Sequence, residues 1–167
     1  MSDEIVNRVA NSVLITFDLE DLYVPGDRIK VDLSQWLEQG FVLREKEFRT
    51  AITSFDWSIY KDCYVALFCS TDAILPAWAS LLITAQLNPV TKQIVWGSLQ
   101  DLEHQIFAKA IDELDLSSFE SKPVIVKGCS EKQIPESAFV YLIQKLQPLV
   151  KSLFYGEACS SVPLFKK

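Results

Sequence analysis

The sequence predicts an α/β protein with three layers and a mainly parallel sheet. Apolar strand-like runs alternate with amphipathic helical stretches, and one strand–Cys-Ser–helix–strand segment occurs twice, at about residues 61–97 and 121–156. Strand–helix–strand segments in series connect parallel strands through right-handed crossovers. Parallel sheets are covered by helices on both faces. We therefore expect residues 1–167 to form a single α/β domain with an internal pseudo-repeat.

The repeat is carried by a Cys-Ser pair that follows an apolar run in each copy, at Cys69-Ser70 and Cys129-Ser130. A proline suits the first turn of a helix, and the residue before a proline disfavours helix. Each copy therefore predicts one helix between two prolines and a strand after it. The flanking prolines are Pro76 and Pro89 in the first copy, and Pro135 and Pro148 in the second.

Other elements follow from hydrophobic periodicity. The repeat also predicts that residues 153–155 form a final strand, although helical periodicity would extend the last helix through them. Strands are expected at residues 13–17 and 29–33, a short helix near residues 34–37, and longer helices at residues 43–55 and 99–116.

Composition restricts the class of protein. A net charge of -6 and a pI near 4.8 argue against nucleic acid as a partner, because phosphate contacts need clustered Lys and Arg. No apolar run approaches the ~20 residues that span a bilayer, and the acidic start lacks the pattern of a signal peptide. We expect a cytoplasmic protein with no membrane contact, whose four cysteines are reduced.

A third Cys-Ser pair, Cys159-Ser160, follows the second copy of the repeat. Ligands bind beyond the carboxyl ends of parallel strands, where we expect all three Cys-Ser loops to meet at one sheet edge. Thiolates from separate loops can hold zinc or an iron–sulfur cluster. The predicted metal ligands are Cys69, Cys129 and Cys159, with Asp72, Glu157 or His104 as a further ligand.

Two other interpretations of the cysteines remain open. A cysteine at a helix N-terminus has a stabilised thiolate, which would suit a thiol-dependent enzyme or a sulfur carrier. Cysteine is also a common core residue, and Cys63, expected at the opposite end of its strand, is left out of the site. The accompanying serines either bind the cofactor or, as we favour, they or their neighbours cap the following helices. These serines are Ser70, Ser130 and Ser160.

The acidic run Asp18-Leu-Glu20-Asp21 permits a non-catalytic alternative. It could ligate a hard cation or form the face of an interaction domain, but a solvated loop is the favoured interpretation. The lone His104 is expected at the surface of its helix. No glycine-rich nucleotide-binding motif occurs in the chain.

Several longer stretches resemble a bacterial family filed under domain of unknown function 2480. The resemblance covers nearly the whole chain and implies no particular reaction. It does imply a link to iron–sulfur assembly proteins as partners, because family members are often encoded beside sulfur-mobilisation genes. The stretches are Asp18-Leu-Glu-Asp21, Leu43-Arg-Glu-Lys-Glu-Phe-Arg49, Cys69-Ser-Thr-Asp-Ala-Ile-Leu-Pro-Ala-Trp78, Lys127-Gly-Cys-Ser130 and Tyr155-Gly-Glu-Ala-Cys-Ser-Ser-Val-Pro163.

Overall fold

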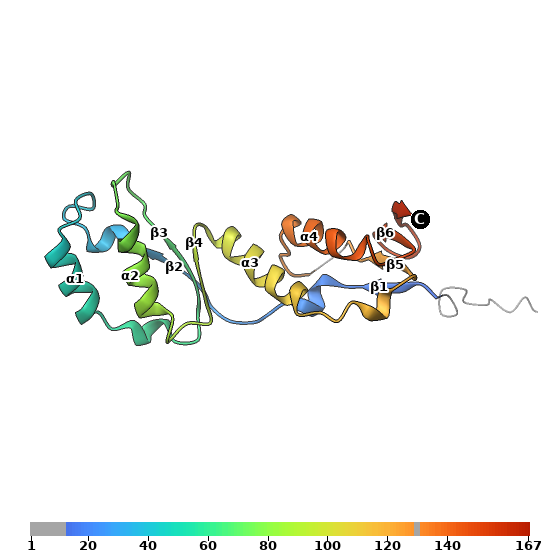
Figure 1. Ribbon diagram of the computed structural model, residues 1–167, viewed down its shortest axis with the longest axis horizontal. Coiled ribbons are helices and arrows are strands. Elements are labelled where there is room, and N and C mark those ends of the chain that lie inside the picture. The colour runs from blue at the N-terminus through green and yellow to red at the C-terminus, as the bar shows by residue number, and fades with distance from the viewer. Residues whose placement is uncertain (1–12, 129–130) are drawn as a thin grey trace, which may run out of the picture. The chain divides into compact units, whose positions relative to one another are not determined.

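The computed structural model describes residues 13–128 and 131–167, and it confirms an α/β fold with mainly parallel strands (Figure 1). The strands are divided between two sheets, which the sequence did not predict. The chain accordingly separates into a central unit, Val24–Ile106, and a terminal unit, Met1–Tyr23 with Phe107–Lys167. That these units act as a single domain stays a prediction.

The central unit contains a three-stranded, entirely parallel sheet in the order β2-β3-β4. The short helix expected near residues 34–37 is a 3-10 turn that begins one residue earlier, at Leu33. The strands are β2 (Arg28–Asp32), β3 (Tyr64–Phe68) and β4 (Gln93–Trp96), and the helices are α1 (Glu45–Ser54), α2 (Ala77–Leu87) and the first part of α3 (Leu99–Asp112), with 3-10 turns at Leu33–Trp36 and Trp57–Tyr60.

Helices cover both faces of this sheet, which gives the three predicted layers. Val65 and Leu67 of β3 point into a core formed with α1 and α2, where Phe48 and Ile83 are fully buried. The alternate β3 residues contribute to a second core with α3. Its buried members are Tyr64, Ala66, Val95, Leu102 and Ile106. The apolar run of β3 is therefore continuous because neither face meets water.

The terminal unit contains a four-stranded sheet in the order β1-β5-β6-β7. The last strand is antiparallel and was not predicted, and it contains Pro163, a residue uncommon in strand interiors. Proline is tolerated there since β7 lies at the sheet edge, where a ladder hydrogen bond is not required. The strands are β1 (Ile15–Phe17), β5 (Pro123–Val126), β6 (Ser152–Tyr155) and β7 (Val162–Lys166), with helix α4 (Glu136–Leu146) and 3-10 turns at Leu19–Leu22 and Ser117–Phe119.

One face of β5 and β6 packs against α4 and the second part of α3. Val124, Val126 and Leu153 come from the strands, and Leu142 and Phe107 come from the helices; all five are fully buried. Burying a side chain of this size stabilises a fold by about 1.5–3 kcal/mol. The strand at residues 153–155 is therefore confirmed, beginning one residue earlier, because Leu153 must reach this core.

The strand–helix–strand segments of the two units contain equivalent backbone hydrogen bonds, and the residues that form them are 59 positions apart in the sequence. Lys92 and Lys151, 59 residues apart, each donate a backbone N–H to the carbonyl of the residue before the first strand. The Cys-Ser pairs of the repeat match the first strands of the two copies with an offset of 60 residues. The strand pairing corrects this offset to 59 residues. Cys69 consequently corresponds to Gly128.

A partly buried ion pair fastens α3 to β2 in the central unit. Arg28 Nε donates to Glu103 Oε1 at 2.6 Å, and the two side chains are 12% and 22% exposed. The Arg28 guanidinium also donates to the carbonyls of Gly26 and Val24 and lies 4.9 Å from the centre of the Tyr64 ring. This arrangement orders the chain that leads into the sheet.

Replacing Glu103→Ala is expected to lower the free energy of unfolding by about 2 kcal/mol, because it leaves the Arg28 charge without its carboxylate in a desolvated position. Urea unfolding followed by tryptophan fluorescence measures this unit alone, since every tryptophan of the chain lies within it. Glu38→Ala is the control: it breaks an exposed pair with Arg44 and should cost less than about 0.5 kcal/mol. Equal losses for both variants would contradict the prediction.

Candidate functional site

Polar side chains follow the parallel strands of the terminal unit at their carboxyl ends, where ligands bind in α/β sheets. Asp18 follows β1, Lys127 follows β5, and Glu157 with Cys159 follows β6. β5 lies between β1 and β6, so these three connections leave neighbouring strands. We call this the terminal edge.

An ion pair between Asp18 and Lys127 lies at the centre of the terminal edge. Lys127 Nζ donates to Asp18 Oδ2 at 2.8 Å, and the Lys127 N–H donates to the Phe17 carbonyl at 2.8 Å. The hydrogen bond from Lys127 lowers the pKa of Asp18 despite its partial burial. The same bond raises the pKa of Lys127, and the carboxylates of Glu157 and Glu20 add to that increase. The Lys127 ammonium is thus paired with the Asp18 carboxylate and also attracted by the carboxylates of Glu157 and Glu20.

Cys159 lies on a tight turn that is attached to the end of β6. The Ser160 N–H donates to the Glu157 carbonyl at 2.9 Å, which closes the turn and leaves Cys159 exposed at its third position. The Gly156 N–H donates to the Val126 carbonyl of β5 at 3.0 Å. Gly156 has a φ of +113°, and a Cβ there would approach the Ser160 carbonyl to 3.1 Å. This glycine allows the turn to fold back closely over the strand end.

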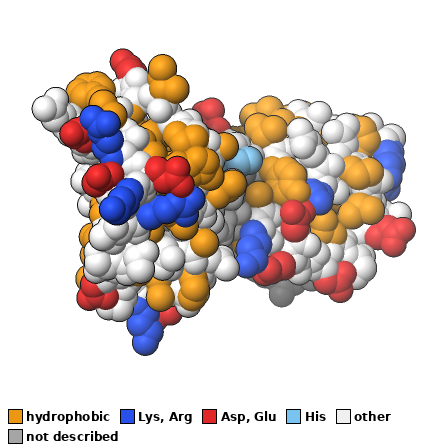
Figure 2. Space-filling view, turned by 60° about the vertical axis from the view of Figure 1, so that its left-hand side comes forward, with side chains coloured by type: hydrophobic (Ala, Val, Ile, Leu, Met, Phe, Trp, Pro, Cys, Tyr) orange, Lys and Arg blue, Asp and Glu red, His pale blue; other side chains and the backbone are white. Residues whose placement is uncertain are grey.

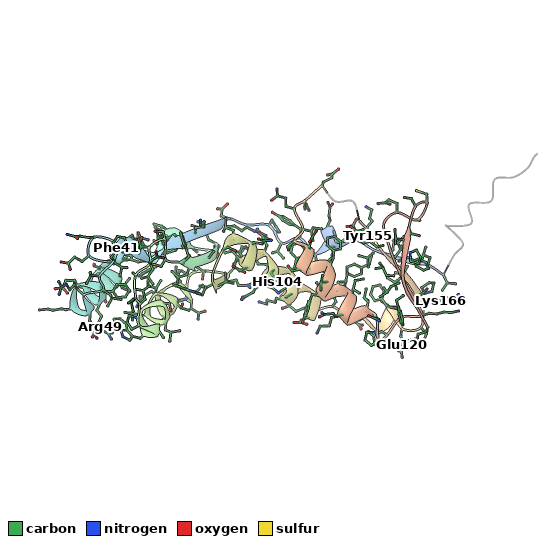
Figure 3. The ribbon with its side chains drawn as sticks, turned by 90° about the horizontal axis from the view of Figure 1, so that it is seen from above. Phe41, Arg49, His104, Glu120, Tyr155 and Lys166 are labelled. Atoms are coloured by element: carbon green, nitrogen blue, oxygen red, sulfur yellow. The ribbon has the colours of Figure 1, made fainter. Side chains whose placement is uncertain are left out.

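Tyr155, the last residue of β6, covers the start of the loop after β5. Its hydroxyl donates to the Gly128 carbonyl at 3.4 Å, and its ring packs edge-to-face on Phe139 (Figure 3 labels Tyr155). A Cβ at Gly128 would lie only 2.8 Å from the Tyr155 ring. A larger residue at Gly128, the position that corresponds to Cys69, would therefore displace the Tyr155 ring.

The central unit has a corresponding edge, at which Asp32 holds two loops together. Asp32 Oδ1 accepts the N–H groups of Ser34 and Ser70, each at 3.0 Å. Burial alone would raise the pKa of Asp32, but hydrogen bonds from Ser70 and Ser34 outweigh it and lower the pKa. Cys69 Sγ is half-buried and lies 3.4 Å from Thr71 Oγ1, which donates to the Gly40 carbonyl.

The prediction that all three Cys-Ser loops meet at one sheet edge is wrong. Cys69 and Asp72 follow β3, whereas Cys159 and Glu157 follow β6 of the other sheet. Cys129 and Ser130 lie outside the described residues. Within residues 13–128 and 131–167, no group of three or more His, Cys, Asp or Glu side chains could hold a metal ion.

The capping role favoured for the serines is also wrong for the helices that follow the first two loops. Pro76 and Pro135 are the N-cap residues of α2 and α4, and among the described residues neither helix has a side-chain hydrogen bond at its N-cap. Ser70 instead bonds to Asp32, and Ser160 closes the Cys159 turn. The N–H groups of both serines make hydrogen bonds within or between loops. The local sequence does not distinguish a serine in such a loop from one that caps a helix.

Two further expectations are confirmed. His104 is exposed on α3. Cys63 is buried at the start of β3, the opposite end from Cys69, and burial raises the pKa of its thiol. In addition, none of the described helices combines the length and apolar character needed to cross a membrane.

Sequence reasoning missed Lys127 as the partner of Asp18. The signal was present, because Lys127 is a charged residue directly after a fully buried strand end. A charge that directly follows a buried strand lies at the carboxyl edge, within reach of the loops that leave neighbouring strands. Two of the three carboxylates in the acidic run are engaged, since Glu20 Oε1 also accepts the Lys132 N–H at 2.9 Å.

The fold and both edges define an α/β protein built from parallel strand–helix–strand segments, with a charged, thiol-bearing edge in its terminal unit. The chain belongs to the family described as Protein of unknown function (DUF2480), whose model matches residues 3–167. Neither a curated protein nor a solved structure matches the chain.

Replacing Lys127→Met should raise the pKa of Asp18. The lowered pKa of Asp18 stabilises the fold at pH values above its ordinary 3.8, and this stabilisation is lost as the pH falls through the lowered value. Titration of the Asp18 carboxyl carbon by NMR measures the change. Lys122→Met is the control, because Lys122 donates to the Ser118 carbonyl instead. An unchanged Asp18 midpoint in the Lys127 variant would refute the pairing.

Proposed function

We propose that this protein is an accessory protein that uses Cys159 at the terminal edge as a carrier thiol for sulfur. The supporting observation is the exposure of Cys159 on the closed Glu157–Ser160 turn, which is anchored through Gly156 to β5. An exposed thiol on a short, anchored turn can reach the sulfur of a partner without unfolding the carrier. Cys63 is unsuited to this role because it is buried and its thiol has a raised pKa.

The transfer step is a thiol exchange that balances without a further oxidant. The Cys159 thiolate attacks the outer sulfur of a donor persulfide, a bond forms between the two sulfurs, and the donor leaves as a thiolate. Cys159 then carries the persulfide, and the donor thiolate takes up the proton that Cys159 released. An acceptor thiol removes the outer sulfur by the same exchange in reverse.

Sulfur loading tests this proposal directly. The reduced full chain is incubated with glutathione persulfide, and mass spectrometry locates any gain of one sulfur atom on a peptide. We expect loading on Cys159 and at least a tenfold loss in Cys159→Ser, an effect of about 1.4 kcal/mol in equilibrium terms. Cys69→Ser is the matched control and should load normally, because Cys69 is half-buried against Thr71. Loading that survives in Cys159→Ser would overturn the proposal.

A metal site at the same edge is the second candidate. It is favoured by the adjacency of β5 and β6, because the loops that carry Cys129 and Cys159 leave neighbouring parallel strands. Glu157, which follows β6 two residues before Cys159, is half-buried and offers a carboxylate. Two thiolates and a carboxylate suit zinc with one open position, and two thiolates could supply part of the ligand set of an iron–sulfur cluster. Cys69 and Asp72 would not take part.

Metal and sulfide content after purification without oxygen separates the two candidates. A metal site predicts bound zinc or iron that is lost in Cys159→Ser and in Cys129→Ser but kept in the matched variants Cys69→Ser and Asp72→Asn. Absence of metal from the unaltered protein, or its retention in Cys159→Ser, would exclude this site. Sulfur loading on Cys159 would then stand alone.

We further propose that the protein acts in the cytoplasm beside sulfur or iron–sulfur assembly proteins. A donor of persulfide sulfur and an acceptor scaffold are the partners that this chemistry requires. The net charge of -6 supports a protein partner rather than a nucleic acid.

A further inference from the structure

The central unit has an open apolar hollow of about 570 Å³ between the start of α1 and the loop before α2. Three large apolar side chains at its margin are exposed: Phe41 at 58%, Val42 at 47% and Ile74 at 96%. Clustered exposed apolar side chains mark interaction sites on soluble proteins. We call this the acid-lined hollow, formed chiefly by Phe41, Val42, Asp72, Ile74, Pro76 and Trp78.

We propose that the acid-lined hollow binds a helical polypeptide segment whose apolar side chains are flanked by Lys or Arg. The proposal concerns the central unit and is independent of the chemistry assigned to Cys159. Figure 2 shows apolar side chains exposed among charged ones on the surface of this unit. A volume of about 570 Å³ lies within the range of roughly 300–1,000 Å³ typical of binding pockets.

Hydrogen bonds hold the two walls of the hollow in place. The Glu38 N–H donates to the Val42 carbonyl at 2.9 Å, which closes a short antiparallel turn around Phe41. Thr71 Oγ1 donates to the Gly40 carbonyl at 2.6 Å and ties this turn to the loop that carries Ile74. The apolar margin is therefore largely preformed, which lowers the cost of ordering it when a partner binds.

The floor of the hollow is equally well supported. The Trp78 ring packs edge-to-face on the buried Phe48 ring, with centroids 5.9 Å apart. The Arg49 guanidinium lies 5.0 Å from the centre of the Trp78 ring (Figure 3 labels Arg49 and Phe41). Trp78 thus offers a fixed aromatic surface, of the kind enriched at the energetic centre of interfaces.

The charge of the residues that line the hollow indicates the charge of its partner. Both charged lining residues of the hollow, Glu45 and Asp72, are acidic. Glu45 pairs with Arg49 at 2.9 Å, whereas Asp72 is exposed, with no hydrogen bond or ion pair to any residue of the described chain. Because the Asp72 carboxylate lies near Ile74 in the lining of the hollow, a partner with a cationic side chain next to an apolar one would match both residues. A second copy with a net charge of -6, or an anionic lipid surface, would be repelled.

An amphipathic helix fits these features because its side chains at positions i and i+4 project together into a groove. The probe is a fluorescein-labelled Leu/Lys peptide of about 18 residues, or five helical turns, with leucine on one face. Fluorescence anisotropy with the unaltered full chain should give a Kd of about 1–100 μM. Ile74→Ser should weaken binding about tenfold, because it removes a central apolar contact.

Matched controls make the result specific. Leu81→Ser replaces another exposed apolar side chain, 65% exposed on α2 and outside the hollow, and should leave the Kd unchanged. Asp72→Lys should weaken binding of the Leu/Lys peptide and strengthen binding of its Leu/Glu counterpart. Near-UV circular dichroism checks that the fold of each variant is retained.

Three results would overturn the proposal. The first is an equal loss of peptide binding in Leu81→Ser and Ile74→Ser. The second is a doubling of mass in sedimentation that Ile74→Ser abolishes, which would assign the hollow to a second copy. The third is binding to phosphatidylglycerol vesicles that Ile74→Ser abolishes, which would assign it to a membrane surface. The sulfur-loading result on Cys159 is unaffected in each case, so the two proposals fail separately.

Discussion

Burial of both faces of the β2-β3-β4 sheet is the constraint on which the central unit depends. A parallel sheet exposes apolar side chains alternately on its two faces, so each face needs its own helical cover. In β3 the residues Val65 and Leu67 serve one core and Ala66 serves the other. The first part of α3 supplies the second cover through Leu102 and Ile106. The loops at the carboxyl edge are then set by where these strands and helices end.

Each unit has an aspartate at the equivalent strand end, and the two aspartates have different partners. Asp18 directly follows β1 and Asp32 is the last residue of β2, the strands that pair with the first strand of each strand–helix–strand segment, and each aspartate accepts the N–H two residues later. Asp32 also accepts the backbone N–H of Ser70, and so it binds a loop through an uncharged group. Asp18 meets Lys127 and so creates a charged edge. The position of one lysine therefore decides which edge carries a charged pair.

Much of the secondary structure follows from local sequence, whereas the candidate site does not. Proline positions and apolar periodicity predicted α2 and α4, and the internal repeat predicted β6, because those signals act within one segment. The repeat also gave a wrong register, because matching Cys69 with Cys129 shifts the alignment of β3 with β5 by one residue. The Tyr155 ring lies over Gly128, the true counterpart of Cys69, so that a side chain there would displace the ring. Such a contact joins different strands and has no local signature.

The sequence by itself determined the α/β class, the order of the elements from β1 to β6 and the place of Cys63 at the opposite end of β3 from Cys69, because each depends on burial patterns within short stretches of chain. Only the tertiary structure decided that the strands form two sheets, that Cys69 and Cys159 follow strands of different sheets, and that Asp18 meets Lys127. These outcomes depend on which strands pair across more than a hundred residues of chain, as β1 does with β5. Such pairing is governed by the packing of whole faces, which no single motif encodes.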